Sequence, residues 1–364
     1  MKNRIDQPKN HEFTICIENI KNLTSIGTKI EDFESIPSDG KYYTILGKGN
    51  FGFAEKVKSK LNNKIYAIKK LSVKDVNINI KDFIRETTFM TELEHKYIMK
   101  LYGYFQAYEN KNKLKEIYLD DKKERFKNIN EDVYMYNLVM ECMPNGSLDT
   151  LCKNYQKQNK IVEQGFIIKI IKQLLEVLIY LESKSLMHRD IKLDNILLYK
   201  NYDIKLTDFG ISAVYQQKNS KHNKGDIIIS NFSKVGRIDF VAPEVYSQNY
   251  DFKVDIYDLG LSMLCLMSKT NPISQNENRK ININPQLMYE NYNKYLKILV
   301  LTMILEQENR PKANEAYNEL EMIEVNINNP NNNYAITILN NKIKDLIAKF
   351  QQQENQIQNN PQQM

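Results

Sequence analysis

The first part of the chain, up to residue 141, alternates hydrophobic and polar positions in the way that is typical of β-strands. Residues 61–63, Leu-Asn-Asn, are a hairpin signal between two such stretches. Only residues 81–93 have helical spacing, with Phe83, Met90 and Leu93 on one side. We therefore predict one main helix and strands over residues 43–46, 55–60, 64–71, 98–105 and 133–140.

The pattern becomes helical after residue 147. Residues 164–183 place apolar side chains three or four positions apart, as on one helix face. Residues 255–267 and 296–305 are apolar nearly all round, which predicts buried helices. This order of elements predicts an α+β chain with two lobes, the first rich in strands and the second mostly helical.

Three segments stand apart from these lobes. Residues 1–41 are polar and end in a turn-type cluster, so we expect an N-terminal extension that is a tail or binds a partner. Residues 109–132 are dense in charge, which predicts a solvated insertion. An Asn/Pro-rich break at 326–333 opens a tail over 325–364, whose last residues, 351–364, are rich in Gln and Asn.

The tail contains an amphipathic helix over about residues 334–352. Two interpretations are open: a coiled coil through which the chain associates with itself, or a single helix that docks on its own domain or frays in solvent. The spacing 3-4-3-4-7 is carried by Ile336, Leu339, Ile343, Leu346, Phe350 and Ile357.

Composition narrows the class of protein. Apolar residues make up 42% of the 364 residues, enough for a sizeable core, and the net charge of 51 − 45 = +6 is small and scattered. We therefore expect no nucleic-acid partner. The longest apolar run, residues 298–305, is far short of a membrane span, and the start has no secretory pattern. We therefore expect no membrane partner. The cysteines at 16, 142, 152 and 265 form no CxxC pair, so we expect free thiols and an intracellular protein in the cytoplasm, with the nucleus left open.

Candidate chemistry begins with Gly47, Gly49 and Gly52, which would let backbone amides approach phosphate oxygens. A dinucleotide-binding fold uses the same spacing but needs a helix directly after the glycines, whereas here a hairpin follows. Lys69, in the strand Tyr-Ala-Ile-Lys, could neutralise phosphate charge with Glu86 as its partner, and Lys70 is its competitor on the opposite face. A surface lysine is the ordinary alternative for either.

The most informative stretch is residues 188–195, His-Arg-Asp-Ile-Lys-Leu-Asp-Asn, in a loop between the long helix and a short strand. Asp208-Phe209-Gly210 follows thirteen residues after Asn195. A carboxylate that accepts a hydroxyl proton, a nearby Lys, and an Asn and an Asp that hold Mg²⁺ are together the requirements of phosphoryl transfer.

With these motifs the chain resembles a eukaryotic-type protein kinase over about residues 42–324. The glycine loop, strand Lys, helix Glu, His-Arg-Asp loop and Asp-Phe-Gly appear in family order. Ala242-Pro243-Glu244 follows them, and Asp255, Gly260 and Arg310 match later family positions, with Arg310 expected to pair with Glu244. The resemblance implies a bilobal fold with an N-lobe over 42–141, a hinge at 141–143 and a C-lobe over 144–324.

The resemblance also implies roles. Asp190 would orient the substrate hydroxyl, Lys192 would steady the γ-phosphate, Lys69 would pair with Glu86, and Asn195 and Asp208 would bind Mg²⁺. The implied ATP-binding residues are Leu46, Gly47, Lys48, Gly49, Asn50, Phe51, Gly52, Phe53, Ala54, Ala67, Lys69, Met140, Glu141, Met143 and Leu197. The implied activity is serine/threonine-specific, because Lys192 stands where that class carries it, and the implied partners are protein substrates and an upstream activating kinase.

One position departs from the family. Arg237 replaces a threonine whose hydroxyl normally links the catalytic Asp and Lys, which leaves open a pseudokinase scaffold with weak or no transfer. Between Asp208 and this position, Ser233 is the candidate activating phosphosite, with Ser230 as the runner-up and an unmodified loop serine as the alternative.

Overall fold

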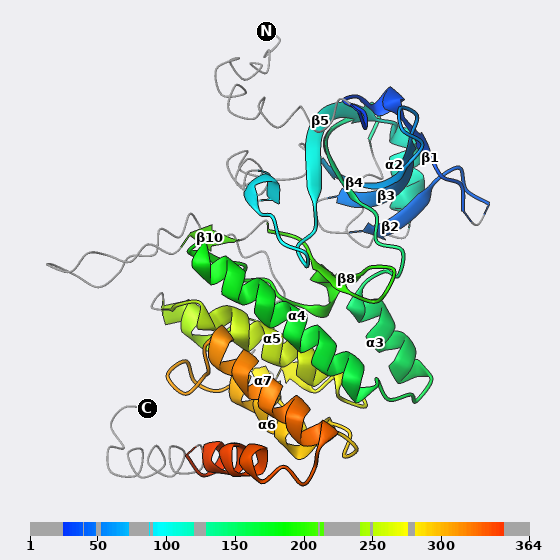
Figure 1. Cartoon of the computed structure of the whole chain (residues 1–364). Coiled ribbons are helices and arrows are strands. Elements are labelled where there is room, and N and C mark those ends of the chain that lie inside the picture. Colours follow the sequence, from blue (N-terminus) through cyan, green and yellow to red (C-terminus); the bar gives the residue numbers. More distant parts are fainter. Residues whose placement is uncertain are drawn as a thin grey trace, which may run out of the picture. The chain divides into compact units, whose positions relative to one another are not determined.

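A computed structural model gives the fold of the chain (Figure 1). It describes residues 25–38, 40–48, 52–72, 87, 90–119, 129–209, 212–214, 241–247, 250–275 and 281–345. The chain divides into two compact units, Met1–Pro144 and Asn145–Met364, and each is described by itself.

The first unit contains an antiparallel sheet in the order β1-β3-β4-β6-β5, with β2 also paired to β3. Its strands are β1 (Phe33–Ser35), β2 (Thr44–Lys48), β3 (Gly52–Ser59), β4 (Ile65–Ser72), β5 (Leu101–Glu109) and β6 (Val133–Glu141). Three of the five predicted strands, β2, β4 and β6, lie within two residues of these bounds, and β3 begins three residues earlier than predicted. Strand β5 begins three residues later and ends four residues later than predicted, and the apolar residues Ile98 and Met99 are buried in the segment before it.

The two faces of this sheet are named after neighbouring lysines. Strand residues alternate between faces, so Lys69 and Lys70 of β4 point to opposite sides. On β3 the Lys70 face carries Phe53, Glu55 and Val57, all at most 2% exposed. The Lys69 face carries half-buried positions of the same strand. The Lys70 face is therefore the one that buries most of the apolar surface of this unit.

Two segments outside the predicted strands cover the Lys70 face. Ile26 and Phe33 pack against one half of it, together with Val57, Ile68 and Phe105. Residues 25–35, expected as part of a tail or partner segment, thus belong to the folded unit, with β1 paired to the end of β3 and a short 3-10 helix, η2 (Ile30–Asp32), before it.

The other half of the Lys70 face is covered by α2 (Lys111–Ile117) from the β5–β6 connection. Leu114 and Ile117 are at most 1% exposed there. The prediction of a wholly solvated insertion is therefore wrong for residues 110–118: the charge-dense segment contains two well-spaced apolar residues that bury against the sheet.

The second unit is mostly helical. Its helices are α3 (Leu148–Lys157), α4 (Gln164–Ser183), α5 (Lys253–Leu266), α6 (Lys294–Met303) and α7 (Ala313–Asn328). Helix α4 has the predicted bounds, and α5 and α6 lie within two residues of theirs. Thirteen of the fourteen residues of α5 are buried, as its all-round apolar sequence predicts.

Short strands and 3-10 turns connect the helices. The strand pairs are β7 (Leu186–Met187) with β10 (Ala213–Val214), β8 (Ile196–Leu198) with β9 (Ile204–Leu206), and β11 (Ile273–Gln275) with β12 (Ile281–Ile283). The 3-10 turns are η3 (Leu193–Asn195), η5 (Pro243–Ser247) and η6 (Pro285–Leu287).

The tail helix, described over residues 333–345, docks on the second unit. Ala335 and Leu339 are at most 2% exposed. The hydroxyl of Tyr295 in α6 donates to Asn340 (2.9 Å), and Lys342 pairs with Glu319 of α7 at 2.8 Å. Over these residues the contacts favour the interpretation of a helix docked on its own domain. Leu346, Phe350 and Ile357 lie outside the described residues.

Two further expectations concern the whole chain. Within the parts that the structure describes, none of the helices combines the length and the apolar character of a membrane span. Cys142, Cys152 and Cys265 are free thiols, and Cys16 lies outside the described residues.

Candidate active site

The loop between β7 and β8 brings three predicted residues together around one carboxylate. Lys192 Nζ donates to both oxygens of Asp190, at 2.8 Å and 2.6 Å. Asn195 Nδ2 donates to Asp190 Oδ2 at 2.8 Å and to the Asp190 backbone carbonyl at 2.9 Å. The arrangement fixes the direction of the carboxylate and places a cation and an amide beside it.

The backbone of this loop is held by α5. Asp255, in the first turn of α5 and 2% exposed, accepts the backbone N–H groups of His188 at 2.8 Å and Arg189 at 2.7 Å. Arg189 has a φ of 65°, a left-handed conformation that costs an L-residue of order 1–3 kcal/mol. Two turns later Ser262 donates to the carbonyl of Ile191 at 3.2 Å. The buried helix α5 thus holds the strained backbone of this loop through side-chain hydrogen bonds.

The β8–β9 hairpin brings Asp208 to the same loop. The N–H of Thr207, next to Asp208, donates to the Asn195 carbonyl at 3.0 Å. Phe209 is fully buried, with its ring 4.6 Å from that of His188. Asp208 itself has a φ of 71°, so the chain turns sharply between β9 and the Phe209 anchor.

Burial shifts the pKa values of the ionisable groups in this loop. Burial raises the pKa of Asp190, while the Lys192 charge opposes the rise and the Asp208 charge adds to it. Burial lowers the pKa of His188 and favours a neutral ring. Its Nδ1 accepts the Asp190 N–H (3.3 Å) and its Nε2 faces the Thr207 carbonyl (3.1 Å), which assigns the proton to Nε2. Asp190 is therefore a more basic carboxylate than an ordinary aspartate.

A buried arginine links η5 to the loop between α6 and α7. Arg310, whose side chain is fully buried, pairs with Glu244 through both carboxylate oxygens. Its guanidinium also donates to the carbonyls of Lys253 (2.8 Å) and Leu305 (2.7 Å) and lies 4.8 Å from the Tyr257 ring centroid. The expected pairing of Arg310 with Glu244 is present, and it anchors η5 beside the first turn of α5.

The register of the first unit places several predicted ATP-binding residues on one face. Lys69 is directly opposite Ala54, and Ala67 is opposite Met140, so all four lie on the Lys69 face. At Gly52, the first residue of β3, an added Cβ would lie 1.7 Å from the carbonyl oxygen of Lys70, so only glycine fits.

Other predicted ATP-binding residues lie elsewhere. The side chain of Phe53 is on the Lys70 face, buried against α2, and Lys48 Nζ donates to the carbonyl of Ile117 in α2. Leu46 is 42% exposed on β2, Gly47 has open space around it, and Glu141 Oε1 accepts the Lys100 N–H (2.8 Å). Met143 is buried in the first unit, and Leu197 is half-buried on β8 of the second.

Comparison with known proteins decides the family. The protein kinase domain family matches residues 41–356, most of the chain. The chain belongs to the protein kinase family. Its α+β fold agrees with the class that the sequence predicts.

Named relatives of the kinase carry the same domain in longer chains. The MAP kinase kinase MKK1/SSP32 of Saccharomyces cerevisiae is 28% identical over 311 residues, 85% of this chain and 53% of that protein. The Aurora kinase of the same yeast is 31% identical over 254 residues, 68% of this chain and 58% of that protein. The serine/threonine-protein kinase PLK4 of Danio rerio is 27% identical over 254 residues, 68% of this chain and 22% of that protein. The kinase thus spans little more than half the length of the first two relatives.

Several predicted residues of the kinase lie outside the described part of the chain. They are Gly49, Asn50, Phe51, Phe83, Glu86, Gly210, Ser230, Ser233 and Arg237, and most of the predicted helix over residues 81–93 lies outside it as well. Their roles stay predictions.

Sequence reasoning missed some supporting residues. Asp258 is 4% exposed, and burial raises its pKa well above the ordinary value, with the neighbouring Asp255 charge adding to the rise. Ser262 supports the loop through the Ile191 carbonyl. The only available signal was their spacing from Asp255 on one helix, at i+3 and i+7, because neither residue type stands out in an apolar run.

Proposed function

We propose that this kinase is an active, Mg²⁺-dependent serine/threonine kinase that transfers the γ-phosphate of ATP to protein hydroxyls. The observation that supports the proposal best is the Asp190 carboxylate, fixed by Lys192 and Asn195 on a loop that Asp255 holds. A scaffold that had lost transfer would not need this carboxylate to be directed so closely.

The chemistry would rest on positioning and electrostatics. Asp190 would accept the hydrogen bond of the substrate hydroxyl and direct its oxygen at the γ-phosphorus. Its raised pKa makes the carboxylate a better proton acceptor as the hydroxyl loses its proton. Lys192, held 2.6 Å from Asp190, is placed to turn its ammonium to the negative charge that develops on the transferred group.

Asn195 and Asp208 fit a magnesium ion. With Asn195 Nδ2 donating to Asp190, the amide oxygen is left to bind a cation, and Asp208 supplies a carboxylate from the hydrogen-bonded neighbouring segment. Among the described residues no group of three His, Cys, Asp or Glu could hold a metal, which suits an ion that takes its other ligands from phosphates and water. A bound Mg²⁺ would neutralise phosphate charge there.

Serine/threonine specificity is supported by the relatives, among which PLK4 is named a serine/threonine-protein kinase, and by Lys192 in its loop. We further propose that an upstream kinase activates the protein at Ser233. Replacement of Ser233 by Ala should then abolish the gain in activity that follows treatment with an activating kinase, and an intact mass that shows no phosphate on this segment would refute the idea.

The experiment that tests the function is phosphate transfer from labelled ATP and Mg²⁺ to the kinase itself and to basic and acidic protein substrates. Asp190→Asn should lower the rate about 10²- to 10⁴-fold, and Asp208→Asn should abolish transfer at Mg²⁺ concentrations that saturate the wild type, because the metal loses a carboxylate ligand. Asp194→Asn is the matched control, because Asp194 is an exposed aspartate of the same loop. Phosphoamino-acid analysis of the product should find serine or threonine.

The alternative is a pseudokinase, favoured by Arg237 alone. It predicts no label in wild type even after treatment with an activating kinase, and restored transfer in Arg237→Thr. Binding of ATP without transfer in both proteins would leave the scaffold as the function.

A further inference from the structure

Both strands of the glycine-rich hairpin are attached to α2, the helix in the β5–β6 connection. From β2, the ammonium group of Lys48 donates to the carbonyl of Ile117 at the end of α2. From β3, the carboxylate of Glu55 accepts two hydrogen bonds from Lys113 Nζ, each 2.8 Å long. Because these strands flank residues 49–51, α2 is bonded to the hairpin on both sides of its tip.

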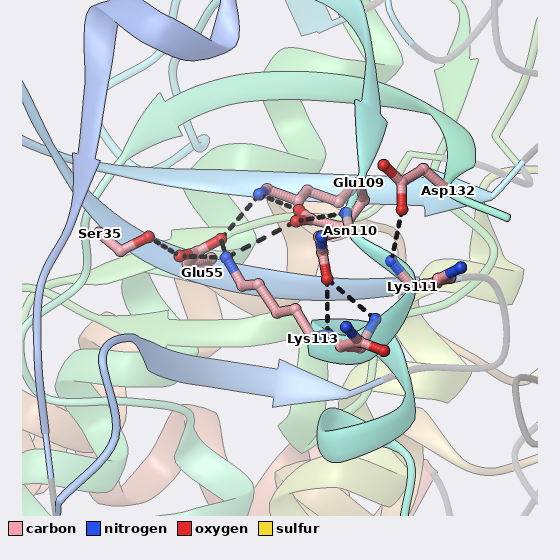
Figure 2. Close-up of polar contacts among 9 residues, drawn as sticks. Ser35, Glu55, Glu109, Asn110, Lys111, Lys113 and Asp132 are labelled. Atoms are coloured by element: carbon pink, nitrogen blue, oxygen red, sulfur yellow. Dashed lines mark hydrogen bonds and ion pairs between the residues drawn. The ribbon is translucent and has the colours of Figure 1, made fainter.

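The bond from β3 belongs to a buried cluster of four charges. Glu55 is 1% exposed and also pairs with Lys70 at 2.7 Å, and Lys70, 2% exposed, pairs in turn with Glu109. Figure 2 shows the side chains of Glu55, Glu109 and Lys113 pointing toward one another, with Ser35 donating to Glu55 (2.5 Å). Two acidic and two basic groups balance, so the cluster is satisfied only while Lys113 of α2 stays in place.

Apolar packing strengthens the attachment. Phe53, the residue after Gly52, is 2% exposed and lies in one cluster with Leu114, Ile117 and Tyr118. The rings of Phe53 and Tyr118 meet edge to face with centroids 6.4 Å apart. The hairpin residue that continues directly from the glycine motif is therefore seated on α2.

Helix α2 is itself firmly held by the sheet. Asn110 caps it by accepting the N–H groups of Asn112 (2.9 Å) and Lys113 (3.3 Å). The N–H of Lys111 donates to Asp132 (3.0 Å), just before β6. As Figure 2 shows, these contacts fasten the start of the helix, which follows the end of β5, to the residue before the start of β6. The hairpin is thus linked through α2 to strands far from it in the sequence.

We propose that α2 positions the glycine-rich hairpin and so sets the affinity of the kinase for ATP, with Lys48 acting as a positioning residue through the Ile117 carbonyl. The inference rests on the proposed function, since the hairpin is taken to cover ATP phosphates. A hairpin attached on both sides has fewer conformations to lose when nucleotide binds, and so binds it more tightly. The C-terminal end of a helix also favours an ammonium group through its dipole.

The test compares Lys48→Met, Leu114→Ala and the double variant with wild type. Lys58→Met is the control, because Lys58 lies at the opposite end of β3 from Gly52 and pairs with the exposed Glu34 of β1. The Kd for ATP is measured by calorimetry on the full chain, and kcat by transfer under saturating ATP. Thermal unfolding verifies that each variant is folded.

We expect Lys48→Met to raise the Kd for ATP about three- to ten-fold, with kcat within about two-fold. Because Lys48 acts through α2, Lys48→Met should add little in the Leu114→Ala background. Effects of the two substitutions that multiply would mean that Lys48 contacts the nucleotide directly and would overturn the proposal, as would an unchanged Kd in Lys48→Met. If Leu114→Ala does not fold, Lys113→Met takes its place in the cycle with the same expected outcome. A wild type that binds ATP without transferring phosphate would refute the proposed function but leave this binding test intact.

Discussion

The hydrogen bonds from Asp255 to the catalytic loop lead to a prediction that separates positioning from stability. Asp255→Asn keeps the size of the side chain but replaces one acceptor oxygen by an NH₂ group. One of the two N–H groups, from His188 or Arg189, then faces a donor in a site that is 2% exposed. The left-handed backbone at Arg189 loses part of the contact that holds it.

Two opposing effects decide how much Asp255→Asn changes the free energy of unfolding. The lost hydrogen bond to a charged group is worth about 1.5–3 kcal/mol, and an unpaired buried N–H costs a further 1–3 kcal/mol or so. Against this, burial raises the pKa of Asp255, so a neutral side chain relieves part of the cost of burying the charge. We therefore expect a net loss of about 1–3 kcal/mol in the free energy of unfolding of the second unit.

The effect on catalysis should be larger than the effect on stability. Relaxation of the loop at Arg189 would shift Asp190 relative to the substrate hydroxyl, and a displacement of about 1 Å can cost about 10²-fold in rate. We expect kcat to fall about 10- to 100-fold while the KM for ATP changes little. The assay combines urea unfolding with steady-state kinetics at saturating ATP.

Asp251→Asn is the matched control. Asp251 lies beside the start of α5 and accepts the N–H of Lys253 (2.8 Å), a role in which Asn serves as well as Asp. This variant should keep kcat and stability. If Asp255→Asn keeps kcat within two-fold of wild type while Asp190→Asn abolishes transfer, the reasoning that Asp255 positions the loop is refuted.

Three further predictions concern stability. Burial alone would raise the pKa of Glu55, but the charges of its lysine partners outweigh burial and leave that pKa below its usual value. Glu55 therefore stabilises the fold at pH values above the ordinary glutamate pKa, and this contribution is lost as the pH falls below that value to the lowered pKa of the folded state. Glu55→Gln should therefore flatten the acid side of a plot of Tm against pH, whereas Glu34→Gln, at an exposed pair, should leave the plot unchanged. Gly260→Ala should cost about 1–3 kcal/mol in urea unfolding, because its Cβ would lie 2.7 Å from a methionine Cβ of α6, while Gly165→Ala, with open space on α4, should gain about 0.4–1 kcal/mol. Arg310→Met should cost about 3–5 kcal/mol, because it removes the fully buried guanidinium that pairs with the Glu244 carboxylate, and a loss under 1 kcal/mol would show that the pair contributes little.

The sequence predicts long elements well because their periodicity extends over many residues. Helix α4 has twenty residues and six apolar positions on one face, so its bounds follow from the pattern alone. Helix α2 has seven residues, and only Leu114 and Ile117 are buried, which is too short a pattern to recognise inside a charged segment. Its formation depends on the sheet face that it covers, and no local pattern carries that information.

In the candidate site too, local arrangements could be predicted from the sequence and contacts between distant residues could not. The convergence of Asp190, Lys192 and Asn195 was predictable because the three residues lie within six positions on one loop. The support from Asp255 could be expected only from the family resemblance, because 65 residues separate it from Asp190. The partners of Lys70 come from β3 and from the end of β5. Strand alternation therefore predicts which face of the sheet Lys70 occupies, but not which carboxylates it pairs with.

The opposite faces of Lys69 and Lys70 on β4 explain why residues 25–35 and α2 belong to the first unit. If the Lys69 face binds ATP, it must stay accessible to a polar ligand and cannot be filled with apolar side chains. The apolar burial that stabilises the sheet must then come mainly from the Lys70 face. Residues 25–35 and α2 supply it, each covering one half of that face. The charged cluster around Lys70 lies where the two halves meet, since Ser35 contacts it from β1 and Lys113 from α2. Loss of either segment should therefore weaken the cluster and, through Glu55 on β3, reach the hairpin that we propose covers the nucleotide.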